Sequence, residues 1–108
     1  MIGVLPVIDH SAATAWYAKL FGRAADVEPA EGVAEWQIAE NAWVQVSADP
    51  EPAGRTTLVI GVTDLDAHLA DCLAVGIVIS EVSDYGFIRT ADVTDPAGNT
   101  ILFVQNIP

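Results

Sequence analysis

The chain has 108 residues, of which 52% are hydrophobic and 18% are charged, a composition typical of one globular domain rather than a disordered chain. Fifteen acidic residues against four Lys and Arg give a net charge of -11, which repels phosphate backbones and argues against nucleic acid as a partner. No apolar run approaches the roughly 20 residues of a membrane span, and the N-terminus lacks the basic start of a signal peptide, so we expect no membrane partner and a cytoplasmic protein.

The first half of the chain predicts one strand, one helix and three further strands. An apolar strand over 2–7 is followed by a helix that Asp9 or Ser11 can cap and that ends at Gly22. A spacing of four defines the expected apolar face of this helix: Ala12, Trp16 and Leu20. Strands are expected over 25–29, 33–39 and 42–47, with turns at 31–32 and 40–41.

The segment over 48–55 contains two prolines and one glycine and is predicted to be a linker. After it the same order returns, with a strand over 56–62, a helix over 65–75 and strands over 77–82, 87–93 and 100–105. One face of the second helix is expected to contain Leu65, Leu69, Cys72, Leu73 and Gly76. Because Cys72 is the only cysteine, an internal disulfide is excluded and a reducing compartment suits the chain.

One pattern occurs twice. The run V-I-D-H-S-A-A-T-A-W-Y-A-K-L-F-G over 7–22 returns in looser form as V-T-D-L-D-A-H-L-A-D-C-L-A-V-G over 62–76, with Asp64 in the place of Asp9 and Gly76 in the place of Gly22. We therefore expect a single domain of two βαβββ modules, over about 1–49 and 56–108, and an α+β fold class.

The W-Y-x-x-L-F-G end of the first helix and the run V-T-D-P-A-G-N-T-I-L-F over 93–103 resemble the vicinal oxygen chelate superfamily, of glyoxalase, bleomycin-resistance and extradiol-dioxygenase type. Together with the repeat, the resemblance covers essentially the whole chain. It implies tandem βαβββ modules whose curved mixed sheets form a cup-shaped cleft, usually within a homodimer.

The resemblance also places the metal ligands of metal-dependent members at Ile2, Thr57, Leu102 and either Val44 or Gln45, of which strand alternation favours Gln45. A zinc, iron or nickel centre needs about three donors from imidazole, carboxylate or thiolate groups, and these residues supply none. His10 and His68 fall at or within predicted helices, away from the strands of the cup. We therefore expect no metal and no other cofactor.

Strand alternation predicts which side chains line the cleft and which, such as Leu5, Val7 and Ile101, turn to the core. The residues assigned to its mostly apolar wall include Val4, Trp43, Gln45, Thr57, Val59 and Leu102. Trp36 and Phe87 are further aromatic candidates, with core or interface packing as the alternative for each. Arg89 could receive an anionic or carbonyl group of a ligand, or form a salt bridge. Three acids could form a cation-attracting rim or a solvated surface: Glu35, Glu40 and Asp92.

No nucleophile elbow, P-loop or dinucleotide fingerprint is present in the sequence. Two functions remain. The first is a metal-independent binding protein, similar to bleomycin-resistance members, that sequesters an aromatic or cationic small molecule in an apolar cleft. The alternative is a glyoxalase-like lyase or isomerase, or a dioxygenase, that uses a nonstandard metal or none. The absent ligand set favours binding over catalysis.

Overall fold

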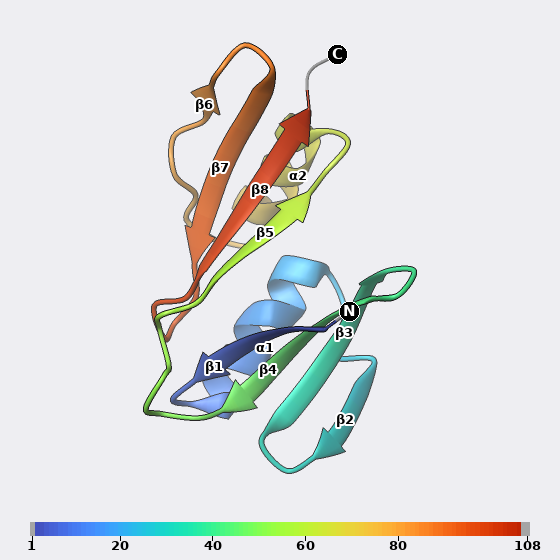
Figure 1. Cartoon of the computed structure of the whole chain (residues 1–108), viewed down its shortest axis with the longest axis vertical. Helices are drawn as coiled ribbons and strands as arrows, with labels where there is room; N and C mark the ends of the chain where they lie inside the picture. The colour runs from blue at the N-terminus through green and yellow to red at the C-terminus, as the bar shows by residue number, and fades with distance from the viewer. Residues whose placement is uncertain (1, 107–108) are drawn as a thin grey trace.

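Each half of the chain folds into one four-stranded sheet with one helix on one of its faces (Figure 1). The computed structural model describes residues 2–106. The first sheet and its helix consist of β1 (Ile2–Val7), α1 (His10–Phe21), β2 (Val27–Ala30), β3 (Val33–Ala39) and β4 (Ala42–Ala48). The second sheet and its helix consist of β5 (Thr57–Gly61), α2 (Leu65–Ala74), β6 (Ser83–Asp84), β7 (Ile88–Thr94) and β8 (Thr100–Asn106). The predicted fold class, α+β with two tandem βαβββ modules and open curved mixed sheets, is confirmed.

The two sheets have the same topology and matching registers. Their strand orders are β1-β4-β3-β2 and β5-β8-β7-β6, and in each the first and last strands of the module pair in parallel. Such a parallel pair requires a long crossover, which the helix and the two middle strands supply. Val4 faces Gln45 in the first sheet, and Val59 faces Leu102 at the matching position of the second.

Both helices begin at the predicted aspartates. Asp9 accepts a hydrogen bond from the Ala12 amide at 3.0 Å, and Asp64 accepts one from the Ala67 amide at 3.1 Å. These bonds satisfy one free N–H at each helix start, so the alternative cap, Ser11, is wrong. After the helices, Gly22 and Gly76 take left-handed conformations.

The buried helix faces differ from the predicted ones at two positions each, Ala12 and Trp16 in the first and Leu73 and Gly76 in the second. In α1 the core-facing residues are Ala13, Tyr17 and Leu20, while Ala12 is exposed. In α2 they are Leu65, Leu69 and Cys72, while Leu73 is 61% exposed. Apolar character alone therefore did not distinguish Ala12 and Leu73, which face the solvent, from the residues that face the core. Burial raises the pKa of the Cys72 thiol, which fits its predicted place in the core.

The expected strand over 77–82 is wrong for most of its length. Ile79 forms one isolated bridge with Val93, and β6 contains only Ser83–Asp84. The Ser80 side chain explains part of this difference, because its hydroxyl accepts a hydrogen bond from the Asp92 amide at 2.8 Å. A side chain thus takes a backbone donor that a regular ladder would have used.

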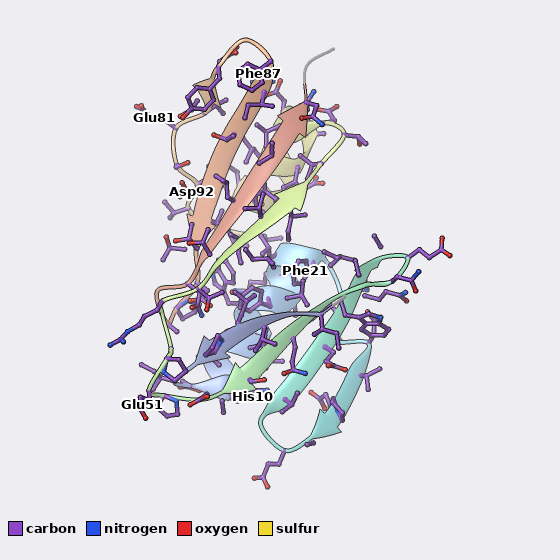
Figure 2. All side chains as sticks on the ribbon, viewed as in Figure 1. His10, Phe21, Glu51, Glu81, Phe87 and Asp92 are labelled. Carbon is purple, nitrogen blue, oxygen red and sulfur yellow. The ribbon has the colours of Figure 1, made fainter. Side chains whose placement is uncertain are left out.

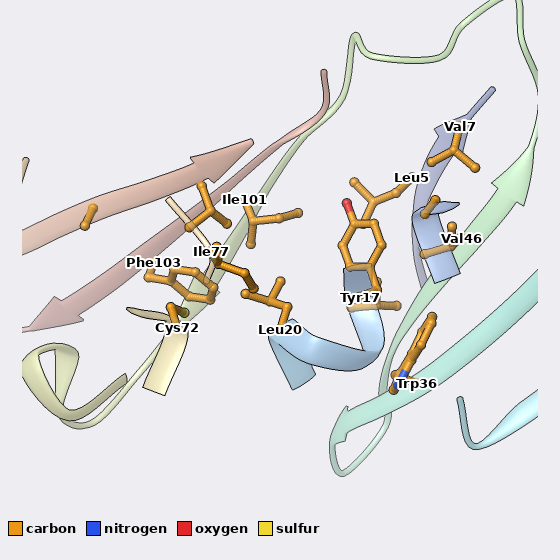
Figure 3. Packing of buried hydrophobic residues seen from close by; sticks show 14 of the residues in the cluster. Leu5, Val7, Tyr17, Leu20, Trp36, Val46, Cys72, Ile77, Ile101 and Phe103 are labelled. Carbon is orange, nitrogen blue, oxygen red and sulfur yellow. The ribbon is translucent and has the colours of Figure 1, made fainter. Parts of the chain in front are cut away.

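Residues from both modules share one hydrophobic core, which fills the space between the helices and the sheets (Figure 3). Tyr17, Trp36 and Val46 lie in the first module. Leu20 extends from the end of α1 toward Ile77 and Phe103 of the second module. Because the core crosses the boundary, the modules stabilise each other by excluding apolar surface from water. No helix within residues 2–106 is long and apolar enough to span a membrane.

The D-P-A-G-N turn between β7 and β8 is folded around the buried carboxylate of Asp95, which is only 4% exposed. Its Oδ1 accepts hydrogen bonds of 2.8–2.9 Å from three backbone amides of the same turn, at residues 97–99. Its Oδ2 accepts hydrogen bonds from the Tyr17 hydroxyl at 2.7 Å and from the side-chain Nδ2 of Asn99 at 2.9 Å. Buried polar atoms require such partners, and one of these partners belongs to the other module.

Asn99, which is fully buried, extends the same network to two more strands. Its Nδ2 donates to the carbonyl of Pro6 in β1 at 2.7 Å, and its Oδ1 accepts from the Thr56 amide, just before β5, at 3.1 Å. In the linker, Gly54 approaches the Ala97 backbone so closely that a Cβ atom there would lie 2.3 Å from the Ala97 oxygen. The turn therefore fixes β1, α1, β5 and the linker relative to one another.

Candidate ligand-binding face

The sheet surfaces that turn away from the helices carry a set of accessible side chains, which we call the open face. Its members are Ile2, Val4, Glu35, Trp43, Gln45, Ser47, Thr57, Val59, Asp92 and Leu102. The alternation predicted for β1 is confirmed, because Ile2 and Val4 are 54% and 45% exposed whereas Leu5 and Val7 are fully buried. Val59 of β5 is 59% exposed. A large part of this surface is therefore apolar and accessible.

A chain of polar side chains crosses the open face of the first sheet. The Gln45 amide nitrogen donates to Oε2 of Glu35 at 2.7 Å, and the Ser47 hydroxyl donates to the Gln45 amide oxygen at 2.8 Å. Both ends of the Gln45 amide are thus used, and the amide holds the Glu35 carboxylate in one orientation. A carboxylate fixed in this way can bind a cation or a donor without first being ordered.

The second sheet carries a carboxylate at the matching position. Glu35 pairs with Gln45 across β3 and β4, and Asp92 pairs with Leu102 across β7 and β8. Ala91 and Val93 on either side of Asp92 are buried, so the Asp92 side chain points to the open face, and Figure 2 labels it on β7. Glu40, the third acid of the expected rim, lies in the exposed β3–β4 turn. Two carboxylates and no basic side chain therefore lie among the members of the open face.

Trp36 does not lie on the open face, so its assignment to the cleft wall is wrong. Its side chain is fully buried between the first sheet and α1, where its Nε1 donates to the Arg23 carbonyl at 3.0 Å. The ring packs against Phe21 and Tyr17, with centroid separations of 5.6 and 6.2 Å. Trp36 pairs with Val44, and directly paired residues share a face of the sheet. The register shifts between Gln37 and Ala39, so the predicted turn at 40–41 could not have revealed the pairing of Trp36 with Val44.

Arg89 also lies on the helix side of its sheet, so its assignment to the cleft is wrong. It alternates with the core residues Ala91 and Val93 and forms a salt bridge with Asp66 on α2, at 2.9 Å. The Asp66 carboxylate raises the pKa of Arg89, and the guanidinium lowers the pKa of Asp66. The salt-bridge alternative is the arrangement that forms.

Phe87 lies just before β7, at the end of the second module beside the β6–β7 loop (Figure 2). It is 68% exposed, and neighbouring Tyr85 is 61% exposed. Gly86 between them has a φ of 86°, so the chain turns here and the predicted strand begins one residue late. The structure therefore places Phe87 on a loop and not among the strand positions that surround Gln45.

Comparison with protein-family models and with curated proteins finds no match for the chain. Among solved structures, a glyoxalase/bleomycin resistance protein from Catenulispora acidiphila is 31% identical, over 100% of this chain and 97% of that chain, with a TM-score of 0.93. The chain belongs to the vicinal oxygen chelate superfamily.

Two more distant structures share the superfamily fold. TnmS3, an antibiotic-binding protein from Streptomyces sp. CB03234, is 21% identical over 98% of this chain and 93% of that chain, with a TM-score of 0.82. A lactoylglutathione lyase from Agrobacterium tumefaciens is 17% identical over 97% and 91%, with a TM-score of 0.79. One is described as a binding protein and the other as an enzyme, so the fold alone does not select between these activities.

The residues at the superfamily's metal positions do not fit a resident metal. Ile2 and Leu102 have no donor atom, and the Gln45 amide is already bonded at both ends. Thr57 and Glu35 add one hydroxyl and one carboxylate, which is below the three or four strong donors that zinc or iron requires. Within residues 2–106, no group of three or more His, Cys, Asp or Glu side chains is placed to hold an ion.

The two histidines lie away from the open face. The His10 side chain, at the start of α1, lies 3.4 Å from the Thr14 hydroxyl. The His68 ring, on α2, packs against Phe103 with a centroid separation of 4.2 Å. Because both side chains belong to the helical side of the sheets, neither joins the four superfamily positions. Metal independence stays a prediction that rests on the chemistry of these residues.

Proposed function

We propose that this superfamily member is a metal-independent small-molecule-binding protein, of bleomycin-resistance type, that sequesters an aromatic or cationic ligand on the open face. One observation carries the proposal: the open face combines accessible apolar side chains with a carboxylate, Glu35, that Gln45 holds in place. Trp43 beside Gln45 offers a flat ring for a planar ligand. The antibiotic-binding description of TnmS3 supports this class of function.

Charge favours a cationic ligand. Ion pairs within residues 2–106 involve Arg23 with Asp26 and Arg89 with Asp66, so Glu35 and Asp92 have no basic partner in this part of the chain. The net charge of -11 adds a long-range attraction for cations. A planar cation could stack on Trp43 while its charge meets the Glu35 carboxylate.

We also propose that the protein acts as a homodimer in the cytoplasm. Ile2, Val4 and Val59 are large apolar side chains that one chain leaves exposed, and a second copy would cover part of this surface. A dimer would also enclose the ligand, which strengthens electrostatic contacts by excluding water. The buried Cys72 thiol requires no oxidising compartment.

A thermal-shift panel of cationic aromatic antibiotics tests the proposal. A ligand at 100 times its Kd stabilises the folded state by about 2.7 kcal/mol, and each kcal/mol raises the Tm of a domain of this size by about 4–8 °C. Glu35→Gln should weaken the binding of a cationic hit by about fivefold, the equivalent of about 1 kcal/mol. Glu40→Gln, with the same charge change in the β3–β4 turn, is the matched control.

Two results would contradict the proposal. If Glu35→Gln and Glu40→Gln weaken binding equally, the ligand senses only net charge and does not contact the open face. If no compound shifts the melting curve while an aldehyde or a catechol is turned over, the alternative of a lyase, isomerase or dioxygenase replaces the binding function. Analytical ultracentrifugation tests the dimer, and a monomer at micromolar concentration removes that part of the proposal.

A further inference from the structure

A cleft of about 540 Å³ lies on the helical side of the protein where the two modules meet. Its apolar walls include Leu20, Phe21 and Ile38 from the first module and Ile60, Val75 and Phe103 from the second. Figure 2 labels Phe21 at the end of α1, next to the second module. Ile60 and Phe103 alternate with Val59 and Leu102 along their strands, so this cleft and the open face lie on opposite sides of the second sheet.

The cleft has the size and surface of a small-molecule site. Ligand pockets commonly measure about 300–1,000 Å³ and combine apolar walls with a few polar groups. Here Ile38 and Val75 are 38% and 42% exposed, although the residues behind them, such as Leu20 and Phe103, belong to the buried core. Apolar side chains are thus accessible at a concave position that a single chain forms completely.

Lys19 supplies a cationic group at this cleft. It belongs to the last turn of α1 and is exposed. In residues 2–106 it forms no ion pair, although the chain has fifteen acidic residues against four basic ones. Arg23, at the same end of the cleft, is already paired with Asp26 at 3.1 Å. An unpaired ammonium beside an apolar cavity favours an anionic group on a ligand with an apolar body.

His68 adds a second polar feature that points to a ligand. Its side chain lines the cleft, and its Nε2 is buried without a hydrogen-bond partner among the described residues. Buried nitrogen atoms usually have partners, so this one lowers stability unless another molecule bonds to it. Asp71, one helical turn further along α2, places a negative charge on the same wall. That carboxylate repels an anion and would direct it toward Lys19.

We propose that the cleft between α1 and α2 binds a small amphipathic anion, with its apolar body between Phe21, Ile38 and Val75 and its anionic group at Lys19. This site is separate from the open face and recognises the opposite charge. Because residues of both modules line it, an occupied cleft would stabilise their junction.

Fluorescence titration with anilinonaphthalene sulfonate, an aromatic dye with one sulfonate group, tests the proposal on the intact protein. Val75→Glu should weaken dye binding by about tenfold or more, because it places a carboxylate in the apolar wall. Val59→Glu introduces the same charge on the open face and should leave the affinity within about twofold of the original, as expected for distant sites. The proposal fails if Val59→Glu, rather than Val75→Glu, removes the signal.

Charge-matched variants identify the anionic subsite. Lys19→Gln should weaken dye binding by about fivefold, because it removes a direct charge contact. Arg55→Gln makes the same change of net charge in the linker and should weaken binding much less.

Asp71→Asn should strengthen binding relative to the linker variant Glu51→Gln. His68→Phe keeps an aromatic ring on Phe103 and should weaken binding because it removes Nε2, and unchanged binding would contradict a contact between this nitrogen and the dye. Equal effects of Lys19→Gln and Arg55→Gln would overturn the assigned orientation, and a titration without saturation would overturn the site.

Discussion

The hydroxyl of Tyr17 donates a hydrogen bond of 2.7 Å to Oδ2 of Asp95, and this contact joins α1 of the first module to the β7–β8 turn of the second. Tyr17 is fully buried, and burial next to the Asp95 carboxylate raises the pKa of its phenol far above the ordinary value. The hydroxyl therefore stays protonated and remains a donor at neutral pH. The D-P-A-G-N motif thus acts in assembling the modules, away from the open face.

Tyr17→Phe should destabilise the protein, because it removes one donor from a buried carboxylate while it preserves the ring. The expected loss is about 1–3 kcal/mol, which corresponds to a Tm lower by about 4–8 °C for each kcal/mol. Tyr85→Phe, which removes an exposed hydroxyl, is the control and should change little. Urea and thermal unfolding measure both variants. A Tyr17→Phe protein as stable as the original would show that the contact adds nothing to stability.

Gly54→Ala should cost more stability than Gly22→Ala. Both glycines have a left-handed conformation, with φ values of 81° and 75°, so each alanine carries a backbone penalty of about 1–2 kcal/mol. An added Cβ at Gly22 meets nothing within 4 Å, whereas at Gly54 it meets the Ala97 backbone oxygen at 2.3 Å. The difference between the two unfolding free energies isolates the steric part. Equal losses would show that the linker moves away from the turn at no cost.

Acidification should destabilise the protein through His68. Burial lowers the pKa of its imidazole below the ordinary value of 6.5, and the Asp71 carboxylate offsets this only in part. Between the two pKa values the unfolded chain binds more protons than the folded one, so stability falls as the pH decreases below about 6.5 and levels off below the folded pKa.

Urea unfolding between about pH 7.5 and pH 5 measures this slope, which His68→Phe should reduce by removing the titrating group. His10→Gln removes the other histidine and tests whether the effect belongs to His68. A slope that His10→Gln abolishes, or one that survives His68→Phe unchanged, contradicts the assignment.

Chelation should leave the protein unchanged. Because the superfamily's metal positions carry Ile2, Gln45, Thr57 and Leu102, we expect elemental analysis of purified protein to find no stoichiometric divalent metal. The Tm with EDTA should equal the Tm without it, since removal of a bound structural metal would lower stability. One metal ion per chain or per cleft would contradict metal independence and would favour the enzymatic alternative.

On the strands that pair in parallel, alternation correctly predicted which side chains face the open side of the sheet. The repeat helped because it aligned the positions of the first module with those of the second. Ile2, Val4 and Val59 are exposed, and Leu5, Val7 and Ile101 are buried, as expected. The faces of residues on β3 and β7 were harder to predict, since they depend on the register with which these strands pair with β4 and β8. Trp36 and Arg89 were placed on the wrong side because their partners, Val44 and Gln105, follow from pairings that no local pattern specifies.

The polar chain of the open face was only partly predictable. Gln45 and Ser47 lie two residues apart on one strand and must share a face, but their contact with Glu35 requires the β3–β4 register. The cleft on the helical side gave no signal at all in the sequence. Leu20, Ile38 and Val75 lie far apart along the chain and meet only because both modules pack into one core.

The hydrogen bond from Asn99 to the Pro6 carbonyl connects residues 93 positions apart and has a consequence for synthesis on the ribosome. Pro6 and Tyr17 emerge early, yet their partners Asn99 and Asp95 follow 93 and 78 positions later. The first module therefore cannot complete its buried polar contacts before the second module has been synthesised. We expect the native state to form only after both modules have been synthesised, in one cooperative step instead of module by module.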